Sequence, residues 1–315
     1  MRDLRIVFMG TPDFAVGILQ KLVEANKNIV GVITAPDKPA GRGRKLMQSA
    51  VKKYALSQGL EILQPPNLKD EGFINQLKSL NANLQIIVAF RMLPKVVWAM
   101  PDYGTFNLHA SLLPKYRGAA PINWAIINSE TETGVTTFFI DENIDTGEII
   151  AKSNIEIETD ETVGTLHDKL MDLGSDLVIH TIELIAQDTI KTKVQSTNAT
   201  TKEAPKLTSE NTRIDWTSTA EEIDAFIRGL SPYPVAWSIL ENNGVEIKVK
   251  VYKASVEKES HTLGIGEILT TKKKIRVAIT GGYLDIKEIQ LAGKRKMEVS
   301  ALLNGYSFDN SAKLL

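Results

Sequence analysis

The sequence predicts an α/β protein in which a Rossmann-like parallel sheet domain is followed by a small OB-like β-barrel domain. In the first half, short β-rich apolar runs alternate with helical patterns, as in a parallel sheet with helices on both faces. A polar stretch follows Gln187, and after it short β-like runs are broken by glycines and charges. The 315 residues are enough for two cores. We therefore expect a Rossmann-like domain over 1–189, a linker over 190–210 and a barrel domain over 211–315.

The elements of the first half follow from their local patterns. Thr11 is expected to cap a helix that has Pro12 in its first turn, because threonine accepts from free amides there and proline lacks one. Apolar residues at helical spacing predict a long helix over 162–186, and a shorter helix is expected over 50–58. The expected strands are 4–8, 29–34, 84–89, 105–108 and 135–140.

The second half has a different pattern. Residues 192–210 are rich in Thr, Ser, Lys and Asn and contain few large apolar groups, which is typical of a linker. One helix is expected over 220–228. The short β-like runs that would form the barrel are 246–252, 266–270, 275–279 and 283–291.

Composition excludes several classes of chemistry. The chain contains no cysteine, so disulfides, thiolate nucleophiles, iron–sulfur clusters and cysteine-ligated zinc are excluded. The first apolar run is too short for a signal peptide, and no stretch reaches the ~18 apolar residues of a membrane span. We expect a cytoplasmic monomer that does not contact a membrane. The formal net charge is −1, yet residues 36–53 carry six basic side chains against one acidic side chain.

Two side chains with catalytic potential lie at the end of one expected strand. Asn107 and His109 are two residues apart, so both project to one face of the strand. Ligands bind at the carboxyl ends of strands in sheets of this kind. An amide and an imidazole side by side could stabilise an oxyanion and transfer a proton. The alternative without function is a packed or surface histidine.

A carboxylate partner follows the expected strand 135–140. Asp145 lies in the segment 140–147, which can be interpreted as a loop that delivers a carboxylate, as a solvated acidic turn or as a calcium loop. A calcium loop needs glycine at its sixth position and glutamate at its twelfth, where this chain has Thr146 and Lys152. The calcium interpretation is therefore rejected, and no metal-ligand spacing is present.

Five segments together resemble the folate-dependent formyltransferases. Segment 109–118 (HASLLPKYRG), with 145–147 (DTG), is similar to the signature of this family. Segments 8–14 (FMGTPDF) and 37–46 (DKPAGRGRKL) resemble the branch that acts on methionyl-tRNA, and 227–234 (IRGLSPYP) matches a carboxyl-terminal family segment. The resemblance runs through the whole chain.

The resemblance implies transfer of the formyl group of 10-formyltetrahydrofolate to the α-amine of initiator methionyl-tRNA, without a metal. It assigns a catalytic domain to 1–189 and a tRNA-binding domain to 211–315. The implied catalytic residues are Asn107, His109 and Asp145. The residues implied to contact the folate are Ser111, Leu112, Leu113 and Pro114. The basic loop implied to approach the tRNA acceptor end contains Lys38, Arg42, Arg44 and Lys45.

Three rival functions are considered. Loss of the basic loop and of the carboxyl-terminal tail would favour a formyltransferase for a sugar-nucleotide amine or glycinamide ribonucleotide, but both are present here. A non-catalytic RNA-binding protein would not need all three catalytic side chains. A nicotinamide dehydrogenase is disfavoured because the turn after Gly10 lacks the G-x-G-x-x-G pattern.

The chain also departs from the family at Phe90-Arg91, where Tyr-Gly is frequent. Asn143 replaces a frequent glycine, and we expect it to tolerate a left-handed backbone.

Overall fold

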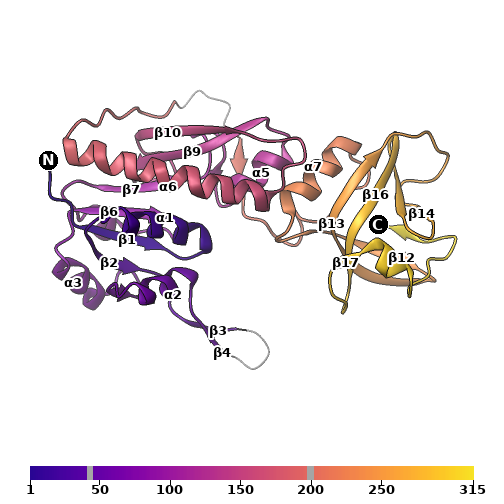
Figure 1. Cartoon of the computed structure of the whole chain (residues 1–315), viewed down its shortest axis with the longest axis horizontal. Coiled ribbons are helices and arrows are strands. Elements are labelled where there is room, and N and C mark those ends of the chain that lie inside the picture. Colours follow the sequence, from indigo (N-terminus) through magenta and orange to yellow (C-terminus); the bar gives the residue numbers. More distant parts are fainter. Residues whose placement is uncertain (41–44, 197–201) are drawn as a thin grey trace. The chain divides into compact units, whose positions relative to one another are not determined.

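The computed structural model describes residues 1–40, 45–196 and 202–315 (Figure 1). The chain divides into two compact units. The first unit comprises 1–118, 133–155 and 167–203, and the second comprises 119–132, 156–166 and 204–315. Within the described residues, no helix is both long and apolar enough to cross a membrane.

A seven-stranded sheet forms the centre of the first unit. Its strand order is β10 (Ile149–Glu156), β9 (Glu132–Phe139), β7 (Thr105–His109), β6 (Leu84–Val88), β1 (Ile6–Gly10), β2 (Ile29–Ile33) and β5 (Ile62–Leu63). The pairs from β7 to β5 are parallel, and β9 runs antiparallel to β7. Strands β1 and β6 are buried along their whole length, because helices cover both faces of the parallel part.

Helices of the first unit pack on both sides of β1. Val7 and Met9 pack against Phe73 and Leu77 of α3 (Glu71–Ser79). Helix α1 (Asp13–Glu24) meets α6 (Val163–Gln187) where Gly17 lies against the Met171 side chain. The remaining helices of this unit are α2 (Ala50–Ser57) and α4 (Lys95–Trp98).

The start of α1 corrects one prediction. The N-cap of this helix is Pro12, with an extended backbone, and no side chain caps the helix. Thr11 lies one residue too early for its hydroxyl to act as the cap, because the N-cap side chain must reach amides two or three residues further on. Proline tolerates the position since the first amides of a helix have no partner within it.

Antiparallel strands form the core of the second unit. Their order is β14 (Ile268–Thr270), β15 (Ile275–Ile279), β16 (Gly282–Leu291), β13 (Val245–Glu257), β12 (Ala236–Asn242) and β18 (Lys313–Leu314), with β17 (Met297–Glu298) beside β16. A bridge between Glu267 and Lys313 joins the two end strands, so the sheet is a nearly closed barrel. The α/β architecture with a Rossmann-like sheet and an OB-like barrel is confirmed.

Three helices belong to the second unit. Helix α7 (Ala220–Leu230) begins with a capping box between Thr219 and Glu222, which satisfies amides that the helix itself leaves free. Helix α5 (Pro121–Ile127) packs on α7, where the Asn123 side chain donates to the Gly229 carbonyl at 2.8 Å. The third helix is α8 (Val299–Leu303), which buries Val299 and Leu302 against the barrel core.

Two short strand pairs complete the described fold. One pairs β3 (Lys38–Ala40) with β4 (Lys45–Met47) in antiparallel register. The other pairs β8 (Arg117–Gly118) with β11 (Glu203–Ala204). The first pair forms the base of the expected basic loop.

Candidate active site

Strand β7 presents two of the expected catalytic side chains at its carboxyl end. Asn107 pairs in register with Ile87 of β6 and with Phe138 of β9. His109, two residues further on, is buried, whereas Asn107 is half-buried. Both side chains therefore lie on one face of the sheet, near the edge where loops leave the parallel strands.

The imidazole of His109 has a defined orientation. Its Nε2 lies 2.8 Å from the Tyr116 carbonyl oxygen. A carbonyl can only accept, so Nε2 carries the proton of the neutral ring. The other nitrogen, Nδ1, lies 3.8 Å from Oδ2 of Asp145, which is an ion-pair distance when the ring is protonated. Nδ1 is therefore the ring nitrogen that is available to exchange a proton.

Asp145 reaches the histidine from the loop between β9 and β10. Its backbone is left-handed, with φ of 55°, which aspartate tolerates better than most residues. Its Oδ2 accepts a hydrogen bond from the Gly118 amide at 3.0 Å. Gly147 allows the loop to fold back, because a Cβ there would lie 1.7 Å from the Phe139 carbonyl oxygen. The left-handed residue of this loop is Asp145, so the tolerance expected of Asn143 is not called upon and stays a prediction.

The Asn107 amide differs from its neighbours in having no internal partner. Among the described residues, no hydrogen bond to its side chain is present, and the residue is only half-buried. An amide that is not used within the protein can donate to a bound group without first breaking a bond inside the protein. This state fits a donor to substrate.

The segment expected to contact the folate divides into two pairs. Ser111 and Leu113 are buried: the Ser111 hydroxyl donates to the Lys115 carbonyl at 2.7 Å, and Leu113 packs with Phe138 and Ile149. Leu112 and Pro114 are partly exposed, and the Leu113–Pro114 peptide bond is cis. The exposed pair can touch a ligand, while the buried pair fixes the course of the loop.

The basic loop is described only at its base. Lys38 is exposed at the start of β3. Arg42 and Arg44 lie outside the described residues, and so does the side chain of Lys45. Asp37 connects the base to α2 and to the segment after β5: it pairs with Lys52 at 2.6 Å and accepts from Gln64 at 2.9 Å.

These contacts at the base have an electrostatic consequence. The Gln64 hydrogen bond, followed by the bond and charge of Lys52, holds the pKa of Asp37 below its ordinary value. Lys52 is thus paired within the protein, although it is one of the six basic residues counted over 36–53.

Sequence reasoning missed one residue of the site. Gln195, inside the expected linker, is buried and donates to the carbonyls of Asp145 and Gly147. Its oxygen accepts from Arg117. No periodicity or motif marks this glutamine, because it is a single polar residue in a polar segment.

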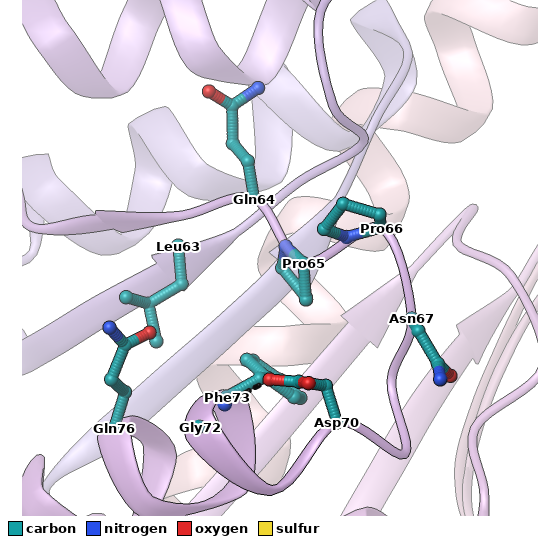
Figure 2. A pocket seen from close by; sticks show the side chains of 9 residues that line it. All are labelled: Leu63, Gln64, Pro65, Pro66, Asn67, Asp70, Gly72, Phe73 and Gln76. Atoms are coloured by element: carbon teal, nitrogen blue, oxygen red, sulfur yellow. Dashed lines mark hydrogen bonds between the residues drawn. The ribbon is translucent and has the colours of Figure 1, made fainter.

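A hollow of about 270 Å³ lies beside the end of β5 and the start of α3 (Figure 2). None of the expected catalytic residues lines it. Asp70, at its rim, caps α3 by accepting from the Phe73 amide at 3.0 Å. Arg91 donates to the carbonyls of Pro65 and Pro66 in the lining loop, and burial lowers the pKa of Arg91. At this position, where the chain has Phe90-Arg91 and the family frequently has Tyr-Gly, Arg91 therefore supports the loop that lines the hollow.

Comparison with known proteins defines the family. A model described as formyl transferase matches residues 4–182, and one described as formyl transferase, C-terminal domain, matches residues 206–307. The chain belongs to the formyl transferase family. It is 57% identical over 314 residues to a protein of Flavobacterium johnsoniae named methionyl-tRNA formyltransferase, covering 100% of each chain. It is 51% identical over 317 residues to one of the same name from Bacteroides thetaiotaomicron, covering 99% of this chain and 98% of the relative.

Solved structures share the fold. HypX from Aquifex aeolicus in complex with tetrahydrofolic acid matches with a TM-score of 0.66 at 18% identity, over 98% of this chain and 49% of that protein. The sugar 3N-formyl transferase WlaRD matches with a TM-score of 0.62 at 21% identity, over 94% of this chain and 100% of that one. At these identities the likeness is one of fold.

Proposed function

We propose that this protein transfers the formyl group of 10-formyltetrahydrofolate to the α-amine of initiator methionyl-tRNA. The observation that carries the proposal is the full-length match, at 57% and 51% identity, to relatives named methionyl-tRNA formyltransferase. The placement of His109 beside Asp145, with Asn107 on the same strand, supplies groups suited to this chemistry.

The reaction forms one C–N bond and breaks another. The neutral amine attacks the formyl carbon, and negative charge develops on the formyl oxygen. The amide of Asn107, and the ring of His109 when its Nδ1 carries a proton, would stabilise that charge; one such donor contributes about 3–4 kcal/mol to lowering a barrier. The amine loses a proton as the new bond forms, and the nitrogen released from the formyl group takes one up.

His109 and Asp145 are assigned to the movement of that proton. The Nε2 proton is held by the Tyr116 carbonyl, so exchange occurs at Nδ1. At 3.8 Å, Asp145 is too far for a direct hydrogen bond and acts on the ring as a charge or through one water. Both roles require the carboxylate to be held close to Nδ1.

The other predicted contacts complete the proposal. The folate would lie against Leu112 and Pro114, in a loop fixed by Ser111 and Leu113. The tRNA acceptor end would meet the basic loop, and basic side chains there would contact phosphates. The cations assigned to this loop are Lys38, Arg42, Arg44 and Lys45. We further propose a cytoplasmic monomer with a catalytic domain over 1–189, a linker over 190–210 and a tRNA-binding domain over 211–315.

An acceptor comparison tests the proposal. The purified chain would be given 10-formyltetrahydrofolate and, separately, methionyl-tRNA, glycinamide ribonucleotide or an amino-sugar nucleotide. We expect kcat/KM for methionyl-tRNA to exceed the other values by at least a hundredfold. A preference for either small acceptor would replace the proposal by its nearest rival. Transfer to none of them would favour a non-catalytic RNA-binding protein.

A further inference from the structure

Gln195 lies in a segment that packs against the loop carrying Asp145. Lys193 and Ile149 exchange two backbone hydrogen bonds, of 2.8 and 2.9 Å, so the segment runs beside the start of β10. Two residues further on, Gln195 has only 5% of its surface exposed. The segment therefore does more than connect two parts of the chain.

The Gln195 amide is matched by partners at both of its ends. Its Nε2 donates to the carbonyls of Asp145 at 2.9 Å and Gly147 at 2.8 Å. Its Oε1 accepts from Nη2 of Arg117 at 2.6 Å. A glutamate would keep the bond to Arg117, but it would turn an oxygen toward two carbonyl oxygens and lose both donors. The site therefore requires an amide.

The same contacts surround the proposed catalytic pair. Tyr116 and Gly118, on either side of Arg117, bond His109 and Asp145 respectively. Gln195 thus ties the backbone of the Asp145 loop to the segment that orients the histidine. Asp145 has a left-handed backbone, which is higher in energy than the conformations that aspartate usually adopts. The hydrogen bonds of Gln195 can hold the backbone in this conformation.

We propose that Gln195 is a positioning residue that holds Asp145 at its working distance from His109. The inference rests on the proposed function for its kinetic consequence, but the geometry it explains is independent of the substrate. Loss of the two donors would let the Asp145 backbone relax, and displacements near 1 Å can cost about a hundredfold in rate.

The kinetic test compares Gln195→Ala and Gln195→Glu with Val194→Ala, whose exposed side chain is in the same segment. We expect both Gln195 variants to lower kcat at least tenfold with KM values for tRNA and folate within threefold of wild type. Val194→Ala should change neither. In an Asp145→Ala background, Gln195→Ala should cost less than about twofold, because the group it positions is gone. Equal losses in the two backgrounds would overturn the proposal.

A second readout does not need a substrate. Hydrogen exchange of the Gly118 amide, which donates to Asp145, should become at least tenfold faster in Gln195→Glu while amides of β1 and β6 keep their rates. Unchanged exchange at Gly118 would refute the positioning role. If wild-type protein formylates no methionyl-tRNA, the proposed function fails, and this exchange measurement still decides the role of Gln195.

Discussion

Asn107→Ala separates catalysis from stability more cleanly than any other change at the site. Within the described residues its amide makes no hydrogen bond, and the residue is half-buried. Removing it should change the free energy of unfolding by only about 0.5 kcal/mol, as for a surface substitution. Loss of one oxyanion donor raises a barrier by about 3–4 kcal/mol, which is a hundredfold or more in rate. The effect should therefore be almost entirely kinetic.

The assay is single-turnover formylation of methionyl-tRNA at saturating folate, run beside thermal unfolding. Asn107→Asp keeps the shape of the side chain but replaces the donor by an oxygen, so it should lose at least as much rate. Asn75→Ala, an exposed change on α3, is the control and should match wild type. A rate for Asn107→Ala within threefold of wild type would refute the assignment of Asn107 as a donor.

Three further changes test the surrounding groups. Asp145→Asn keeps an acceptor for the Gly118 amide but removes the negative charge, so turnover should fall at least a hundredfold and the pH–rate profile should change; an unaltered profile and rate would make Asp145 an ordinary loop residue. Arg42→Ala should weaken tRNA use and lower the salt slope by about 0.7–0.9, with folate binding unchanged; parallel salt plots with equal intercepts would count against a phosphate contact. The lowered pKa of Asp37 stabilises the fold above its unfolded pKa, near 3.9, and this stabilisation is lost as the pH falls through the folded value. The melting temperatures of wild type and Asp37→Asn should thus converge as the pH falls through that folded pKa, and a constant difference would exclude this linkage.

Local patterns were sufficient for five of the seven strands of the first sheet, all but β5 and β10, and for the shared face of Asn107 and His109. Side chains alternate along a strand, and a strand expected over 105–108 was found over Thr105–His109. The approach of Asp145 to His109 could not come from such patterns, because the two residues are far apart in the sequence and their contact depends on the whole sheet. The sequence pattern offered Asp145 as one possible carboxylate partner, the family resemblance selected it, and its catalytic role stays a prediction.

Other details depend on backbone geometry that residue types do not encode. Asparagine and aspartate both tolerate a left-handed backbone, so composition could not place that conformation at Asp145 and not at Asn143. A count of cations likewise could not reveal that Lys52 is paired with Asp37. Gln195 could not be identified from the sequence, because a buried amide in a polar segment is defined by its tertiary partners alone.

The most direct test of the proposed function is formyl transfer to initiator methionyl-tRNA by the purified chain, measured under single turnover for wild type and for His109→Ala. We predict that wild type yields formylmethionyl-tRNA and that the variant is at least a hundredfold slower while still binding folate. Equal rates for the two proteins, or no transfer to methionyl-tRNA by a wild type that formylates a small amine, would contradict it.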